Sequence, residues 1–228
     1  MSASPNSLAK PSTASSQRVP DRPQFGVWHA LTVNIEGDDQ DLARLAEKLA
    51  PGRIRRVLGF AALLQMTHEM IKSSVLDGVA GFYGHVRSGD VWMWGKDQYT
   101  AEVLSNAPKK PFDASLIWLV GRGALTQEQS DRLAAIYTHR HDLTHGLAKY
   151  VVYLDYEPDD AILLDALGIL RDLSIFWTKI DMELGTFEDY PGLDVEDIAP
   201  LGIVVLELSI AAVFEGSLPE WPTAHPMD

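Results

Sequence analysis

The chemistry of this 228-residue chain is concentrated in residues 139–146, HRHDLTHG, which hold one arginine and three histidines. Arginine is always protonated and presents a planar fork of N–H donors that suits a phosphate group. Histidine titrates near neutral pH and can both accept and donate a proton. Arginine and histidine together are sufficient to cut a phosphodiester without a metal ion, so Arg140, His141 and His145 are the candidate catalytic residues.

The same stretch lies on a predicted helix whose apolar stripe includes the arginine. Arg140 falls on the face defined by Leu133 and Ile136, at helical spacing. A charge in such a stripe is unfavourable unless it has a partner or a function. Arg140 and His145 are about 140° apart around a straight helix. We therefore expect them to meet at one phosphate only if the helix ends or bends near Gly146 or a second chain supplies half of the site.

The order arginine, polar residue, three residues, histidine and glycine resembles the signature of the HEPN superfamily, in which many members are metal-independent ribonucleases. Here Arg140, His141 and His145 occupy those positions, and the resemblance extends over about residues 55–185. It implies an all-helical fold, a homodimer with the Arg-His pairs of both chains in one composite site, and RNA as the substrate. Arg140 would stabilise the phosphorane, His145 would act as general base or acid, and His141 would orient the site.

Under this interpretation the protein is an endoribonuclease acting as a toxin or as a defence or stress effector, with an antitoxin or a defence protein as a partner. The alternative is a non-catalytic HEPN-like module that binds a nucleotide or a protein. HEPN toxins silenced by nucleotidyltransferase antitoxins carry a tyrosine two residues after the histidine. Leu147 stands there, so control by tyrosine adenylylation is not expected.

Other interpretations of these residues remain open. His141 and His145 have the i,i+4 spacing of a helical metal site, with His68, Glu69 or the acidic C-terminal half supplying a third ligand. Our main prediction is nevertheless that the chain has no metal site. Arg140 could instead pair with a buried acid in the bundle. His68 would then be an ordinary core histidine. Trp92 and Trp94, in an aromatic glycine-rich connection, are candidates for stacking on RNA bases.

Composition limits the class of protein. The chain has no cysteine, which excludes disulfides, thiol catalysis and cysteine-ligated zinc. Its formal net charge of −13 argues against a protein that coats nucleic acid, so RNA should bind only near local basic groups. Neither a signal peptide nor a membrane span is expected, and we predict a cytoplasmic protein. No glycine-rich phosphate loop or dinucleotide fingerprint is present, so no cofactor is expected.

Hydrophobic periodicity predicts an all-α protein, a bundle of about five to seven helices, and the resemblance implies that this bundle is HEPN-like. Residues 1–24 are predicted to be a disordered leader, 25–215 a single helical domain and 216–228 a mobile tail, with a short strand or arm at 25–35. Thr126 and Gln129 match a capping box that starts the Arg140 helix. The expected helices are 38–50, 54–79, 99–106, one around Trp118, the Arg140 helix, 160–184 and 195–214.

Overall fold

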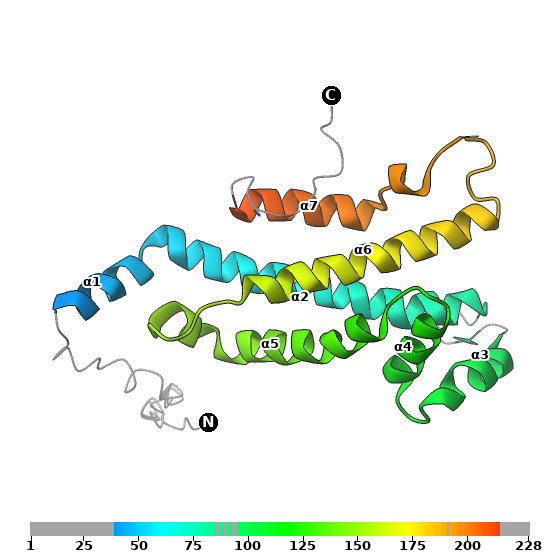
Figure 1. The fold of residues 1–228 in the computed structure, drawn as a ribbon, viewed down its shortest axis with the longest axis horizontal. Helices are drawn as coiled ribbons and strands as arrows, with labels where there is room; N and C mark the ends of the chain where they lie inside the picture. The colour runs from blue at the N-terminus through cyan, green and yellow to red at the C-terminus, as the bar shows by residue number, and fades with distance from the viewer. Residues whose placement is uncertain (1–38, 85–86, 89–90, 93–94, 191, 215–228) are drawn as a thin grey trace, which may run out of the picture. The chain divides into compact units, whose positions relative to one another are not determined.

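The computed structural model describes residues 39–84, 87–88, 91–92, 95–190 and 192–214 (Figure 1). The predicted leader at 1–24, the predicted strand or arm at 25–35 and the predicted tail at 216–228 lie outside these ranges. Within them the chain is helical, as the periodicity predicts. The seven α-helices are α1 (Asp39–Lys48), α2 (Pro51–Phe82), α3 (Lys96–Glu102), α4 (Pro111–Gly121), α5 (Gln127–Val152), α6 (Asp160–Glu183) and α7 (Leu201–Phe214).

Short elements complete the described part of the chain. Strands β1 (Arg87–Ser88) and β2 (Val91–Trp92) form an antiparallel pair in which Arg87 lies opposite Trp92. Leu104–Asn106 and Val195–Asp197 are single 3-10 turns. None of the described helices is long and apolar enough to cross a membrane.

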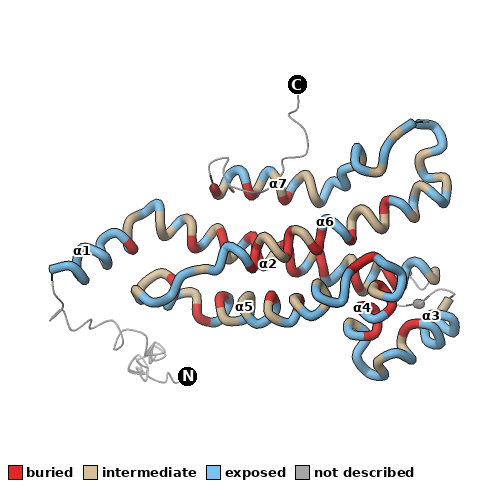
Figure 2. Tube along the Cα trace, viewed as in Figure 1, coloured by how far each residue is buried: buried red, intermediate tan, exposed pale blue. Residues whose placement is uncertain are grey.

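Helix α2 is the centre of the bundle and packs against α4, α5, α6 and α7 (Figure 1). Its buried side chains follow helical spacing and meet apolar side chains of α5 and α6, so the core runs along the helix (Figure 2). Phe60, Leu64, Val75, Ile136 and Leu163 are fully enclosed in this core. The core thereby fixes the face that α5 turns towards α2.

The capping box at the start of α5 is confirmed. The Thr126 Oγ1 atom accepts a hydrogen bond from the Gln129 backbone N–H at 3.1 Å, and the Thr126 N–H donates to Gln129 Oε1 at 2.9 Å. Two N–H groups that would lack partners at the helix end are thus satisfied. This fixes the register of α5 and hence the positions of Arg140 and its histidines.

Two helix boundaries differ from the sequence prediction because of proline. The expected break at Pro51-Gly52 is present between α1 and α2, but α2 begins at Pro51 rather than at 54, because a missing N–H costs nothing at a helix start. We also expected one helix over 195–214. Instead, a 3-10 turn capped by Asp194 ends at Asp197, and Pro200 precedes α7, which starts at Leu201. Proline cannot donate within a helix, so it marks both starts.

Candidate active site

Arg140 is held by two side chains of α2. Its Nε donates to Gln65 Oε1 at 2.5 Å, and its Nη2 donates to Glu69 Oε1 at 3.1 Å. Gln65 and Glu69 are one helical turn apart and are joined by a hydrogen bond of 3.2 Å. The Arg140 side chain is 20% exposed and the Glu69 side chain 48%. The arginine therefore has the acidic partner that a structural role requires, and it is mostly covered, whereas its partner Glu69 is exposed.

Three residues of α5, before and after Arg140, form a row of rings on its exposed side. Tyr137, His141 and His145 are spaced four residues apart, and each is exposed. The Tyr137 and His141 ring centroids are 6.2 Å apart at 22°, and those of His141 and His145 are 4.4 Å apart at 56°. Two imidazoles thus lie side by side at the surface, where both can reach a bound molecule.

Helix α5 bends, but the bend does not bring Arg140 to His145. The irregular residue is Gly146, with φ −114° and ψ 16°, and the helix continues beyond it to Val152. Both catalytic candidates precede Gly146, so the angle of about 140° between them stays that of a regular helix. Within one chain Arg140 turns towards α2, while His145 lies against His141. The bend at Gly146 therefore does not bring Arg140 and His145 to one phosphate. The other possibility is that a second chain supplies half of the site.

His68 lies beside the Arg140–Glu69 pair and is 9% exposed. Its Nδ1 is 3.5 Å from Glu69 Oε1 but makes no hydrogen bond. Burial, followed by the nearby Arg140 charge, lowers the pKa of His68 below 6.5, and these effects outweigh Glu69, which raises it. His68 is therefore a buried imidazole with an unsatisfied nitrogen, not the satisfied core histidine that is the ordinary alternative.

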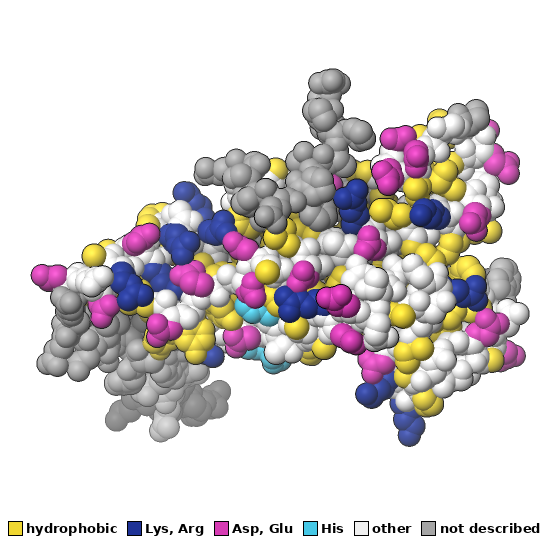
Figure 3. All heavy atoms as spheres, in the orientation of Figure 1, with side chains coloured by type: hydrophobic (Ala, Val, Ile, Leu, Met, Phe, Trp, Pro, Cys, Tyr) yellow, Lys and Arg dark blue, Asp and Glu magenta, His cyan; other side chains and the backbone are white. Residues whose placement is uncertain are grey.

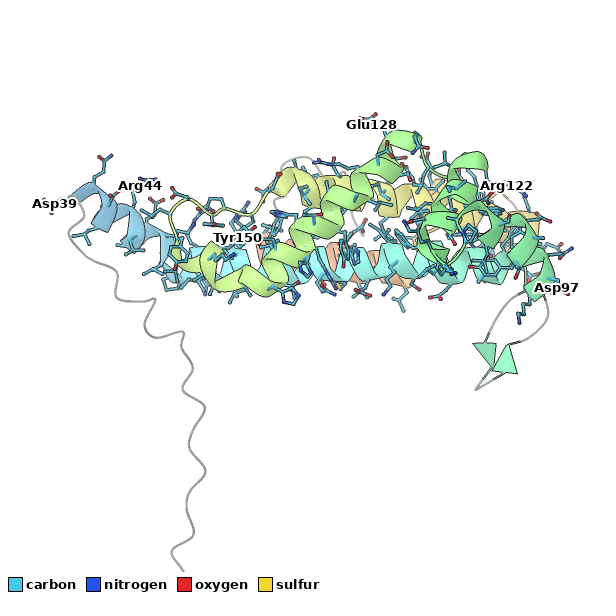
Figure 4. All side chains as sticks on the ribbon, turned by 90° about the horizontal axis from the view of Figure 1, so that it is seen from below. Asp39, Arg44, Asp97, Arg122, Glu128 and Tyr150 are labelled. Atoms are coloured by element: carbon cyan, nitrogen blue, oxygen red, sulfur yellow. The ribbon has the colours of Figure 1, made fainter. Side chains whose placement is uncertain are left out.

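His139, the remaining histidine of residues 139–146, has a structural role. The His139 Nε2 atom accepts a hydrogen bond from the Asp159 N–H at 3.3 Å. Its ring packs edge-on against Phe60 and Tyr150, and burial lowers its pKa although Asp159 and Asp142 raise it. His139 therefore stabilises the turn before α6. Tyr150, labelled in Figure 4, also donates a 2.6 Å hydrogen bond to Asp142 on α5.

A cleft of about 900 Å³ opens beside Arg140, between α2, α4 and α5. Figure 4 shows α5 crossing α2 obliquely, and the cleft is lined where these helices and α4 meet. Apolar side chains make up part of its lining, and the polar side chains that line it include His68, Glu69, Lys72 and Arg140. The Lys72 ammonium lies 3.9 Å from Glu69 Oε2. Arg140 thus belongs both to the cleft and to the helix turn that carries His141.

The remaining predictions have different outcomes. In the described ranges no group of three or more histidine, cysteine, aspartate or glutamate side chains could hold a metal ion, so a third ligand for His141 and His145 is not found there. The Trp92 backbone pairs in β2, whereas Trp94 lies outside the described residues. Figure 3 shows acidic and basic side chains interspersed on the face it draws, without one large basic patch.

Comparison of the chain with family models, with curated proteins and with solved structures found no match. The HEPN resemblance therefore stays a prediction that rests on the sequence motif.

Sequence reasoning missed the residues that surround Arg140. Gln65, Tyr137 and Ile117 were not selected, although Tyr137 precedes His141 by the same four residues that separate the two histidines. That repeated spacing was the available signal for Tyr137. Gln65 and Ile117 are polar and apolar helix residues without distinctive spacing, and only the packing of α2 and α4 against α5 brings them to the site.

Proposed function

We propose that this protein is a metal-independent endoribonuclease of the HEPN type, acting as a cytoplasmic toxin or as a defence or stress effector. One observation carries the proposal: Arg140, held against α2 by Gln65 and Glu69, precedes an exposed histidine pair whose rings are 4.4 Å apart. This arrangement offers one fixed positive charge and two proton-transfer groups within two turns of one helix.

The reaction needs those groups and no cofactor. One neutral imidazole takes the proton of a ribose 2′-hydroxyl, and the 2′-oxygen attacks the adjacent phosphorus. The bond from phosphorus to the 5′-oxygen then breaks, and a protonated imidazole gives its proton to that oxygen. The products are a 2′,3′-cyclic phosphate and a 5′-hydroxyl. Arg140 stabilises the charge that builds up on the phosphorane.

A second copy of the chain completes the site in this proposal. Arg140 and His145 diverge on one helix, so a shared phosphate requires α5 of a partner in a homodimer. The side of α5 that carries Tyr137, His141, Thr144 and His145 is exposed in the single chain. A twofold contact that covers this side and the adjoining Arg140–Glu69 pair would bring the histidine pair of one chain to Arg140 of the other.

The proposal accommodates the acidic charge of the chain. A net charge of −13 disfavours long-range attraction of RNA, so binding has to come from local contacts. An RNA-bound protein partner, such as an antitoxin or a defence complex, would supply the attraction for RNA that the surface of this chain lacks. In the non-catalytic alternative, the cleft between α2, α4 and α5 binds a nucleotide or a protein. Binding without RNA cleavage would distinguish this alternative from the ribonuclease.

The test compares histidine variants of one helix. The purified protein is incubated with single-stranded RNA in the presence of EDTA. Wild type and His139→Gln should cut, because His139 is half-buried and bonds the turn before α6 rather than facing the histidine pair. Arg140→Ala and His145→Ala should each lose at least 100-fold in rate, the usual contribution of an acid–base or electrostatic group. Activity that requires added zinc or manganese, or that survives in both site variants, would contradict the proposal.

A further inference from the structure

The cleft between α2, α4 and α5 has the composition of a site for a flat, partly polar molecule. Apolar side chains of all three helices line it, and we refer to them as its apolar floor. Two large side chains at its edge are exposed, Ile117 on α4 at 51% and Tyr137 on α5 at 53%. A volume of about 900 Å³ falls within the range of small-molecule sites. The apolar floor residues are Ile71, Phe112, Leu116, Val120 and Leu133.

The polar side chains that line the cleft offer hydrogen-bond donors and acceptors to a ligand. His68 lines the cleft, is 9% exposed and has an Nδ1 atom without a hydrogen bond. An unsatisfied buried nitrogen is unfavourable, so a ligand that shifts Glu69 and meets the imidazole would relieve it. Lys72 and Arg140 also line the cleft, together with the carboxylates of Glu69, Asp113 and Asp131. Glu69 pairs with both cations, so the polar lining carries both signs of charge and suits the donor and acceptor edge of a base.

The cleft adjoins the histidine pair through shared residues. Tyr137 lines it, and its ring faces the His141 ring at 22°. Arg140 lines it and directly precedes His141. A molecule that has its phosphate at Arg140 and His141 therefore has the cleft directly beside that phosphate.

We propose that this cleft binds the nucleobase of the RNA nucleotide next to the scissile phosphate. Tyr137 would stack on the face of the base, the apolar floor would cover the ring, and His68 would meet its polar edge. Aromatic side chains stack on any base, so Tyr137 supplies affinity, whereas the edge contacts supply preference among the bases. This inference rests on the proposed ribonuclease function, because it assigns the substrate group beside the same site.

The experiment measures binding separately from cleavage. The probe is a fluorescent tetranucleotide with 2′-O-methyl groups, which cannot be cut by attack of a 2′-hydroxyl, and the four nucleoside 3′-monophosphates serve as free-nucleotide competitors. Ala134 is exposed and lines the cleft, so Ala134→Trp should fill the cleft without disturbing the core. Ala101→Trp, at an exposed position of α3, is the matched control.

We expect Ala134→Trp to weaken tetranucleotide binding at least tenfold and Tyr137→Ala at least fivefold, with Ala101→Trp unchanged. Wild-type binding through the cleft without any RNA cleavage would support the base site and overturn the nuclease proposal. Cleavage by wild type that Ala134→Trp and Tyr137→Ala leave unchanged, with unchanged binding, would overturn the base site alone. A monophosphate that binds more tightly than the tetranucleotide would contradict RNA as the source of the base.

Discussion

Replacing Arg140 should remove activity at a small cost in stability, and the structure gives the magnitude. Arg140→Met keeps the aliphatic stem but loses the contacts to Gln65 and Glu69. A hydrogen bond to a charged group contributes about 1.5–3 kcal/mol when buried, and an exposed ion pair about 0–1 kcal/mol. Because the Glu69 side chain is 48% exposed and stays near Lys72, it can be rehydrated. We therefore expect a loss of about 1–2 kcal/mol in unfolding free energy.

Leu143→Ala on the same helix is the matched comparison. Leu143 is 1% exposed, so its truncation leaves a cavity and should cost about 2–5 kcal/mol. Urea unfolding followed by circular dichroism measures both variants, and RNA cleavage is measured on each below its unfolding transition. Arg140→Met should be folded and inactive, whereas folded Leu143→Ala should cut. If Arg140→Met is destabilised as much as Leu143→Ala, the arginine is a structural member of the bundle and its catalytic assignment is refuted.

Three further predictions test the packing, the titration and the assembly. A Cβ at Gly78 would lie 2.7 Å from the Trp177 ring, whereas one at Gly168 would meet nothing within 4 Å. In urea unfolding, Gly78→Ala should therefore destabilise the chain by about 1–3 kcal/mol, and Gly168→Ala should stabilise it by about 0.5–1 kcal/mol. Burial lowers the pKa values of His68 and His139 below 6.5. The unfolded chain therefore binds more protons below that pH, and the unfolding free energy should fall as pH drops from about 6.5, with less pH dependence when both are replaced. Light scattering at tens of micromolar should show a dimer, and a monomer would remove the shared site.

The helical fold was predictable because its signals are local. The capping box at Thr126 and the apolar periodicity of the bundle depend on neighbours a few residues away. The two boundaries that differ, at Pro51 and Pro200, are also set locally. Proline ends one helix or begins the next, and no side-chain cap at Ala50 marks the start of α2.

The site was only half predictable, because its partners are distant in sequence. The types and spacing of Arg140, His141 and His145 are visible in one stretch. The Gln65 and Glu69 side chains that hold the arginine lie 75 and 71 residues earlier in the chain. His139 shows the opposite case, in which the sequence suggests a role that the fold does not give. Its type and position in the motif suit catalysis, but its side chain bonds to the turn before α6.

The most direct test of the central claim is the chemistry of the cut ends. RNA incubated with the protein in EDTA should give fragments whose 3′ ends mass spectrometry identifies as 2′,3′-cyclic phosphates, because the Arg-His site activates the ribose hydroxyl. An otherwise identical substrate with deoxyribose at the cleaved nucleotide should stay intact, since it lacks that hydroxyl. Fragments with 3′-hydroxyl and 5′-phosphate ends, or cleavage at the deoxyribose position, would mean that water is the nucleophile and would contradict the account.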